Sequence, residues 1–198
     1  MPLCDSGAMP LLDRDDSVLV VVDAQAGFLD KVDAEVAADV VDRIRWLVTL
    51  AGVLEIPVKV TEEEPERNDP TAKPIRNALP ANAKRHVKPT FGLASTPEIL
   101  ADLESTGRRT AVLVGLETDV CVAQSALGLQ EAGWKVVVIF DAVTSPGVGH
   151  EQGLSRLRDA GVELLGTKAA AYDWLRTVAK AEEVLRLEAL AAPRGIVL

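Results

Sequence analysis

The sequence has few cysteines and no long apolar run. It contains two cysteines, Cys4 and Cys121, in 198 residues, and no Cys-x-x-Cys pair. Two thiols cannot build a disulfide framework, and their spacing offers no zinc-type site, so we infer a reducing compartment. The longest apolar runs, residues 18–22 and 136–140, are far shorter than the roughly 20 residues that cross a membrane. We therefore expect a soluble, cytoplasmic protein.

Positive charge is also scarce. Lys and Arg number 21 against 30 Asp and Glu, which gives a net charge of −9. Binding to a nucleic-acid backbone depends on clustered Lys and Arg, and no basic cluster occurs in this sequence. The first 17 residues are polar and lack the basic start and apolar centre of a signal peptide. We expect no nucleic-acid partner and no membrane partner, and a small molecule as substrate.

The length and composition are those of one globular domain. A chain of 198 residues corresponds to roughly one domain. Apolar residues make up 48% and charged residues 26%, which excludes a disordered chain. We divide the chain into a polar leader (residues 1–17), a single domain (residues 18–190) and a C-terminal tail (residues 191–198).

Short apolar runs alternate with helical patterns along this domain. Residues 18–22 form a β-branched run, which is typical of a strand buried on both faces of a parallel sheet. Apolar residues then recur at helical spacing between residues 36 and 51. Further strands are predicted at residues 57–61, 85–87, 110–114, 135–140 and 162–165, and further helices at 96–106, 119–132, 151–160 and 169–190. Residues 62–80, with four prolines, are predicted to form a long loop. The alternation predicts an α/β fold with one six-stranded, mainly parallel sheet covered on both faces.

Reactive side chains follow several of these strands. Asp23 follows the first strand, Lys88 the third, and Cys121 lies in the turn after the fourth. The carboxyl ends of parallel strands meet at one edge of a sheet, where ligands bind. There the helix N-terminus and the Lys88 ammonium would stabilise a Cys121 thiolate, and Asp23 would take and return a proton. Backbone N–H groups of residues 115–121 would hold an oxyanion.

Four blocks around these residues resemble the isochorismatase-like cysteine hydrolases, in the order and spacing of that family. They are residues 20–25 (VVVDAQ), 88–91 (KPTF), 115–122 (GLETDVCV) and 141–145 (DAVTS), within a resemblance covering roughly residues 17–175. The resemblance implies a three-layer α/β/α, Rossmann-like, isochorismatase-like hydrolase fold. It also implies a catalytic triad of Asp23, Lys88 and Cys121. A cis peptide between Leu116 and Glu117 would aim the N–H groups of Glu117 and Cys121 at the substrate oxygen as an oxyanion hole.

One departure from the family pattern limits the reactions that we expect this protein to catalyse. Nicotinamidase members carry a metal site with an Asp-x-His pair after the second strand, whereas residues 61–65 here, TEEEP, contain no histidine. We therefore expect no metal and no other cofactor. The presence of Cys121 favours hydrolysis of a small amide or related C–N bond through a thioester. The alternatives are vinyl-ether hydrolysis of isochorismate, which needs Asp23 but not Cys121, a noncatalytic scaffold that retains the fold, and a thiol redox sensor.

Several other residues have both a functional and a structural interpretation. Gln25, Phe28, Glu63 and Phe91 are candidate pocket residues, although phenylalanines more often belong to a core. The acidic residues between 62 and 66 fit a solvated loop better. Any of them that reached the pocket would favour a cationic or hydrogen-bond-donating substrate. His86 and His150 are expected to be structural or on the surface. Cys121, judged on position alone, also fits a small buried core residue.

The resemblance further implies a homo-oligomer. The apolar C-terminal residues Val184, Leu185, Leu187 and Leu190 need either internal packing or a partner. They are our candidates for the contact between subunits, whose number the sequence leaves open.

Overall fold

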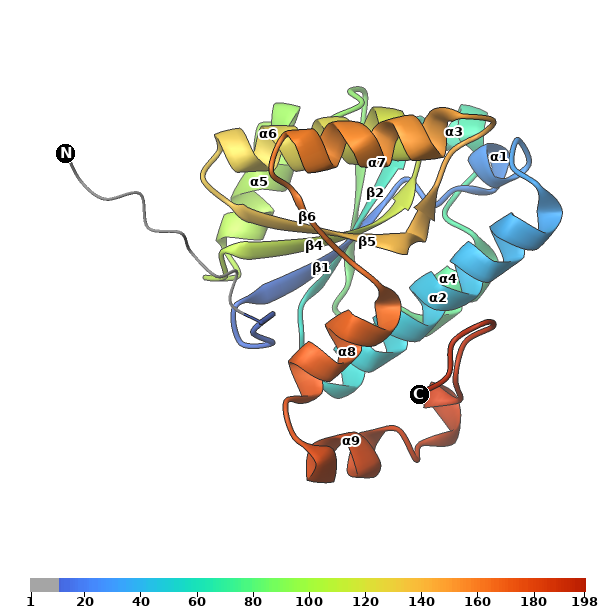
Figure 1. The fold of residues 1–198 in the computed structure, drawn as a ribbon. Helices are drawn as coiled ribbons and strands as arrows, with labels where there is room; N and C mark the ends of the chain where they lie inside the picture. Colours follow the sequence, from blue (N-terminus) through green and yellow to red (C-terminus); the bar gives the residue numbers. More distant parts are fainter. Residues whose placement is uncertain (1–10) are drawn as a thin grey trace.

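A six-stranded parallel sheet forms the centre of the molecule in the computed structural model (Figure 1). The structure describes residues 11–198, so Cys4 and the first ten residues of the predicted leader lie outside it. The strands are β1 (Ser17–Val22), β2 (Val58–Glu63), β3 (Lys84–Lys88), β4 (Thr110–Leu116), β5 (Lys135–Thr144) and β6 (Glu163–Leu165). Their order across the sheet is β3-β2-β1-β4-β5-β6.

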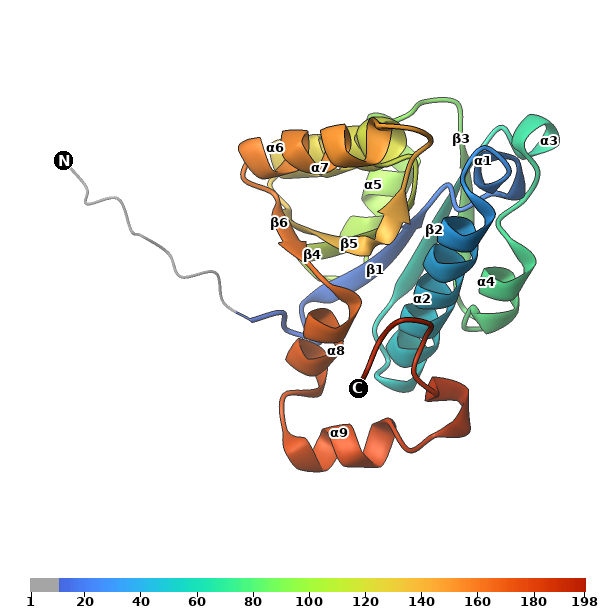
Figure 2. The ribbon, with the colours of Figure 1, turned by 45° about the vertical axis from the view of Figure 1, so that its right-hand side comes forward.

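Helices cover both faces of this sheet, which confirms the predicted three-layer α/β fold (Figure 2). On one side lie α1 (Ala26–Leu29), α2 (Ala34–Val53), α4 (Lys73–Ala78) and α8 (Thr167–Leu175), with α9 (Val178–Val184) beyond them. On the other side lie α5 (Pro97–Glu104), α6 (Ala123–Glu131) and α7 (Gly149–Asp159). The short helix α3 (Pro65–Asn68) and the helical turns η1 (Leu93–Ser95), η2 (Thr118–Val122) and η3 (Glu188–Leu190) complete the elements.

Alternate residues of the central strands enter two separate cores. Leu19 and Val21 of β1 pack in the core on the α2 side, whereas Val18, Val20 and Val22 pack in the core under α5, α6 and α7. All five side chains are fully buried. Burial on both faces is why the strand appears in the sequence as an uninterrupted apolar run.

Two segments differ from their predictions. Residues 62–80 are not one long loop, because β2 continues to Glu63 and the short helices α3 and α4 follow. Each of these helices has a proline in its first turn. Proline is tolerated there because the N–H groups of the first turn make no hydrogen bond within the helix. The predicted helix over residues 169–190 is broken after α8. Arg176 has a φ of 66° there, and the Thr177 side chain caps α9 by accepting a hydrogen bond from the Lys180 N–H.

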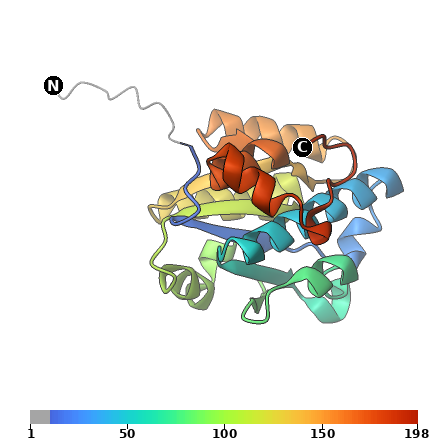
Figure 3. The ribbon, with the colours of Figure 1, turned by 90° about the horizontal axis from the view of Figure 1, so that it is seen from below.

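The C-terminal segment packs back onto the body of the protein and crosses α2 (Figure 3). Trp46 of α2 donates a hydrogen bond from its ring nitrogen to the Leu190 carbonyl, at 3.1 Å. Val184 and Leu190 are buried in the α2-side core, so these two of the four candidate contact residues pack internally. Leu185 is partly buried and Leu187 is exposed. In the part of the chain that the structure describes, no helix is long and apolar enough to span a membrane.

Candidate active site

The candidate residues meet at the point in the sheet where the strand order changes direction. β2 and β3 follow on one side of β1, whereas β5 and β6 follow on the far side of β4. In open α/β sheets the helices diverge at such a point and leave a crevice outside the carboxyl ends of the strands. Asp23 directly follows β1, and η2, which contains Cys121, follows β4. Lys88 ends β3 and reaches the same edge.

The ends of β1 and β4 approach too closely for any side chain at Gly115. Gly115 has a φ of 127°, and a Cβ atom there would lie 1.9 Å from the Val22 carbonyl oxygen. Only glycine fits such a backbone position. A second glycine, Gly153 of α7, lets that helix pack against η2, because a Cβ there would lie 2.7 Å from the Asp119 nitrogen. These two glycines hold the turn that carries Cys121 beside the end of β1.

Asp23 and Lys88 form a fully buried ion pair. The Nζ of Lys88 lies 2.6 Å from Oδ2 of Asp23, and neither side chain is exposed. The Thr61 hydroxyl donates to the other carboxylate oxygen, Oδ1, at 2.7 Å. Lys88 also donates to the carbonyls of Thr90 and Phe91, at 2.7 and 2.8 Å. The three donors of the ammonium thus face three oxygens, and the carboxylate is held in one orientation.

Cys121 lies in η2 with its thiol directed at two carboxylates. The residue is 2% exposed, and Sγ donates to Oε2 of Glu63 at 3.3 Å. A carboxylate oxygen of Asp23, a carboxylate oxygen of Glu63 and the sulfur of Cys121 all lie within 4.8 Å of one another. The peptide between Leu116 and Glu117, which leads into η2, is cis, as the family resemblance implied. The Glu117 carbonyl accepts the N–H of Val120 at 3.2 Å and that of Val122 at 3.0 Å.

The electrostatics of the thiol differ from our prediction. Burial raises the pKa of Cys121, the Asp23 and Glu63 carboxylates raise it further, and Lys88 only partly opposes them. These surroundings favour the neutral thiol over the stabilised thiolate that the sequence predicted. Lys88 already contacts three oxygens, and the Glu63 carboxylate accepts a hydrogen bond from the thiol, so the nearby negative charges oppose a thiolate. Burial also raises the pKa of Asp23, while Lys88 and Thr61 lower it. A carboxylate with a raised pKa next to a thiol is a stronger base.

A cavity of about 440 Å³ opens over Cys121. Its lining is Phe28, Lys31, Glu63, Glu64, Arg67, Asn68, Pro89, Phe91, Glu117, Val120 and Cys121. Three of the four candidate pocket residues, Phe28, Glu63 and Phe91, belong to this lining. Lys31, Asn68 and Val120 were not predicted, because nothing in the local sequence distinguishes them from surface or core positions. Asp23 and Lys88 lie beneath the cavity.

Gln25 does not line this cavity, contrary to the prediction. It is fully buried, and its side chain holds the backbone of Glu63. The Gln25 amide donates to the Glu63 carbonyl at 3.0 Å, and its oxygen accepts the Glu63 N–H at 2.6 Å. A second bond, of 2.6 Å, joins the same amide to the Asp69 carbonyl. Gln25 thus positions a residue of the cavity.

The acidic run divides between structural, cavity and solvent positions. Glu62 is buried and accepts the backbone N–H and hydroxyl of Thr71, at 2.9 and 2.7 Å. Glu63 enters the cavity, so the solvated-loop interpretation is wrong for both. It holds for Glu66, which is exposed, whereas Glu64 is exposed and also lines the cavity.

Both histidines make structural contacts, as expected. His86 lies 2.9 Å from Oδ2 of Asp102, and Nδ1 of His150 lies 3.0 Å from the Thr118 hydroxyl. Burial lowers the pKa of His150, which favours the neutral ring. Neither histidine lines the cavity over Cys121.

Among the described residues, Asp23, Glu63 and Cys121 form the group whose spacing would admit a metal ion. The set fits a cation poorly. The Asp23 carboxylate already contacts the Lys88 ammonium and the Thr61 hydroxyl, and the fixed positive charge beside it opposes a second cation. Zinc sites in proteins also rely mainly on cysteine and histidine, and this group has one cysteine and no histidine.

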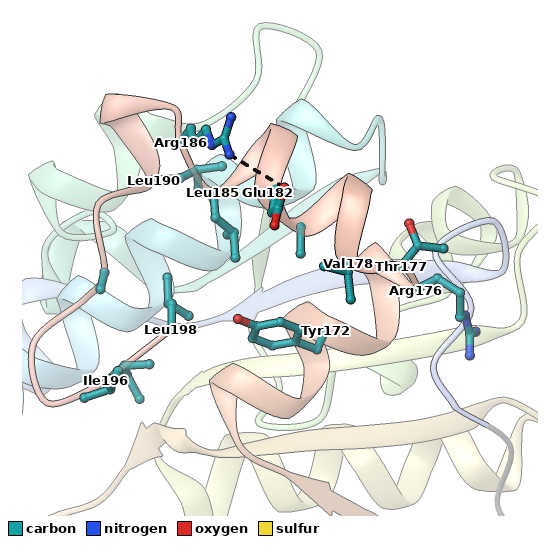
Figure 4. Close-up of a pocket in the computed structure, with 13 residues that line it drawn as sticks. Tyr172, Arg176, Thr177, Val178, Glu182, Leu185, Arg186, Leu190, Ile196 and Leu198 are labelled. Atoms are coloured by element: carbon teal, nitrogen blue, oxygen red, sulfur yellow. Dashed lines mark ion pairs between the residues drawn. The ribbon is translucent and has the colours of Figure 1, made fainter.

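A larger cavity, of about 800 Å³, lies away from these groups (Figure 4). It is enclosed by α8, α9 and the C-terminal residues, with Tyr172, Val178, Leu185, Ile196 and Leu198 around it. An ion pair between Glu182 and Arg186, at 3.6 Å, lies on its rim. Its lining contains no thiol and no histidine, so the smaller cavity over Cys121 is the candidate active site.

Comparison with known proteins identifies the family of the chain. The isochorismatase domain model matches residues 17–169. The chain belongs to the isochorismatase family. Isochorismatase domain-containing protein 2 of Xenopus laevis is 32% identical to it over 150 residues, which cover 75% of this chain and 70% of that protein.

Two solved structures share the isochorismatase-family fold. The MAR1 ribonuclease of Caenorhabditis elegans aligns with a TM-score of 0.80 at 24% identity, over 95% of this chain and 98% of that one. The YcaC protein of Escherichia coli, described as an octameric hydrolase of unknown specificity, aligns with a TM-score of 0.79 at 23% identity. That alignment covers 88% of this chain and 89% of YcaC.

Proposed function

We propose that this isochorismatase-family protein is a metal-independent cysteine hydrolase that cleaves a small amide or related C–N bond. One observation carries the proposal. A buried carboxylate, Asp23, is fixed by Lys88 at 2.6 Å and lies in the same small cluster as the Cys121 thiol, at the floor of a cavity. A base that is oriented by a third group and lies beside a nucleophile is the arrangement that covalent catalysis requires.

In the first half of the reaction, Cys121 acts as the nucleophile. Its Sγ attacks the substrate carbonyl carbon while the S–H proton passes to Asp23. The carbonyl oxygen becomes an oxyanion, which the backbone N–H groups of Glu117 and Cys121 stabilise. When the C–N bond breaks, the leaving nitrogen takes the proton back from Asp23 and departs as an amine. The acyl group remains on sulfur as a thioester.

In the second half, water completes the hydrolysis. Asp23 accepts a proton from a water molecule as its oxygen attacks the thioester carbonyl. The C–S bond then breaks, Cys121 regains the proton from Asp23, and the carboxylic acid leaves. Lys88 takes no proton in this cycle. It holds the carboxylate in place and limits the rise of the pKa of Asp23, so that this group can serve as a base.

Vinyl-ether hydrolysis of isochorismate is the second candidate, and one observation favours it. That reaction needs a proton donor, and the raised pKa of Asp23 increases the share of the acid form. It does not need the thiol. Comparing Asp23→Asn with Cys121→Ala on isochorismate separates the two activities, because only the first variant would stop vinyl-ether hydrolysis.

We also propose that the protein self-associates in the cytoplasm. The octameric E. coli relative and the exposed Leu187 next to the apolar cavity of α8 and α9 support self-association. The reducing compartment is inferred from the sequence, which has two cysteines and no Cys-x-x-Cys pair. Light scattering of the purified protein tests the first point, since a monomer would contradict it.

The test of the hydrolase proposal is a screen of small carboxamides, ureido compounds and carbamoyl amines with the wild type and the Cys121→Ala variant. We expect turnover of at least one class by the wild type and a loss of at least about 1,000-fold in the variant, since the nucleophile is removed. Treatment with a chelator should leave the wild-type rate unchanged. Retention of the wild-type rate by Cys121→Ala would contradict the mechanism.

A further inference from the structure

We propose that Glu63 selects substrates that carry a positive charge or several N–H donors next to the scissile carbonyl, and that it disfavours substrates with a carboxylate there. This inference deepens the proposed function and rests on it. It concerns a residue that the triad does not include. It also names the substrate class: small amides with an ammonium, amidinium, guanidinium or ureido group.

The position of Glu63 is fixed from two sides. Gln25 bonds both its N–H and its carbonyl, and the Asn68 amide donates to the same carbonyl at 3.0 Å. Its carboxylate therefore projects into the cavity from the end of a strand whose backbone is held in place. Sites on such rigid elements are more precise than sites on loops. Glu64, the next residue, also lines the cavity, but it is exposed and lies 3.6 Å from the exposed Arg67. Glu66 is exposed and does not line the cavity.

The charges of the cavity leave Glu63 without a cation of its own. Asp23 is balanced by Lys88 directly beneath the cavity. Within the described part of the chain, no ion pair includes Glu63, whose contact with the Cys121 thiol is a neutral hydrogen bond. Glu117, a second carboxylate on the wall, lies 4.0 Å from the half-exposed Lys31. Lys31 and Arg67, the cations of the lining, and Glu64, which pairs with Arg67, are thus exposed, whereas Glu63 and Glu117 are more buried.

Attack by Cys121 places the substrate next to this carboxylate. A carbonyl carbon positioned for attack lies roughly 3–3.5 Å from the sulfur. Oε2 of Glu63 lies 3.3 Å from the same sulfur, so groups bonded to that carbonyl come within reach of Glu63. An ionised carboxylate only accepts hydrogen bonds. It therefore attracts N–H groups and cations, and it repels a substrate carboxylate, which includes the two carboxylates of isochorismate.

The charge preference can be measured without knowing the substrate. Methanethiosulfonate reagents transfer a thioalkyl group to Cys121 as a mixed disulfide and release methanesulfinate. One reagent carries a trimethylammonium group, another a sulfonate, and a third is uncharged. The rates are measured in a Cys4→Ser background, and each is divided by the rate of the same reagent with free 2-mercaptoethanol. The variants are Glu63→Gln and, as the matched control, Glu66→Gln, which removes the same charge from a nearby exposed position outside the cavity lining.

We expect the normalised rate ratio of cationic to anionic reagent to exceed one in the Cys4→Ser protein and to fall about tenfold in Glu63→Gln. In Glu66→Gln it should change by less than about twofold, because exposed charges are screened. The uncharged reagent serves as the measure of access to the thiol. A ratio that is the same in Glu63→Gln as in the parent would overturn the inference.

A second arm separates this inference from the proposed function. Paired amides that differ only in an ammonium or a carboxylate group are assayed for hydrolysis. Preference for the ammonium member, lost in Glu63→Gln but kept in Glu66→Gln, supports the inference. No hydrolysis of any amide, together with a Glu63-dependent labelling ratio, would overturn the proposed function while leaving the charge selectivity of the cavity in place. Hydrolysis without charge preference would overturn the inference alone.

Discussion

The Nζ of Lys88 lies 2.6 Å from Oδ2 of Asp23, and both side chains are fully buried. The two residues come from the ends of different strands, β3 and β1, with β2 between them. A buried charge without its partner is costly, so each of these residues depends on the other. The pair both stabilises the fold and orients the proposed base, Asp23.

Replacing Lys88 should destabilise the protein strongly. In Lys88→Met the Asp23 carboxylate is left buried and unpaired, and we expect the free energy of unfolding to fall by about 3–5 kcal/mol. Urea denaturation measures this change. Lys84→Met is the matched control, because Lys84 pairs with Asp102 at 2.8 Å but is mostly exposed, and it should cost less than about 1 kcal/mol. The double variant Asp23→Asn/Lys88→Met should recover part of the loss. Equal, small effects of the two single variants would contradict the account of the pair.

The rate of Cys121 alkylation should increase only at high pH. Because the pKa of the thiol is raised in the fold, alkylation by iodoacetamide in a Cys4→Ser background should still be increasing above the ordinary value of 9.0. Removing a neighbouring negative charge should move the profile to lower pH in Glu63→Gln. A plateau below pH 8 in the parent protein would show a preformed thiolate and contradict this account.

The same shift predicts a loss of stability in alkaline solution. In the unfolded chain the thiol loses its proton near the ordinary value of 9.0, whereas the folded protein retains it to higher pH. The contribution is therefore fully present below that value and is lost as the pH rises above it. Unfolding measured between pH 7 and 10 should show a steeper decline for the parent than for Cys121→Ala. Parallel declines of the two proteins would contradict the assignment.

The fall of kcat/KM at low pH should reflect protonation of Asp23. The base must be ionised, and its pKa lies above the ordinary 3.8, so kcat/KM should begin to fall at a pH higher than an exposed aspartate would give. Thr61→Val removes the 2.7 Å hydrogen bond to the ionised carboxylate and should move this fall upward by roughly one pH unit or less. Thr49→Val, whose hydroxyl bonds only the Arg45 carbonyl within α2, is the control. A fall that stays at the same pH in Thr61→Val would argue against Asp23 as the base.

Gly115 should tolerate no side chain. Its φ of 127° and the 1.9 Å approach to Val22 mean that Gly115→Ala must separate β1 from β4, at a cost of more than about 4 kcal/mol. Gly107→Ala is the control, because Gly107 also has a positive φ, of 71°, but has no atom within 4 Å of its absent Cβ. It should cost about 1 kcal/mol. Thermal unfolding of both variants measures the difference, and similar melting temperatures would contradict the packing argument.

The sequence predicted the fold better than the site electrostatics. Buried parallel strands appear as apolar runs, such as residues 18–22, and reactive residues at their ends, such as Asp23 and Lys88, could be placed at one edge of the sheet. The environment of Cys121 could not be predicted in this way. It depends on Glu63, which arrives from another strand, and on the three oxygens around Lys88. Both are tertiary contacts that no local pattern encodes.

The central claim is that Cys121 carries the acyl group during hydrolysis. Intact-protein mass spectrometry of acid-quenched mixtures of the enzyme with an amide substrate tests it most directly. The account predicts a mass increase equal to the acyl group, located at Cys121 by peptide mapping and absent in Cys121→Ala. Hydrolysis of that substrate by Cys121→Ala at the wild-type rate, with no adduct on either protein, would contradict it.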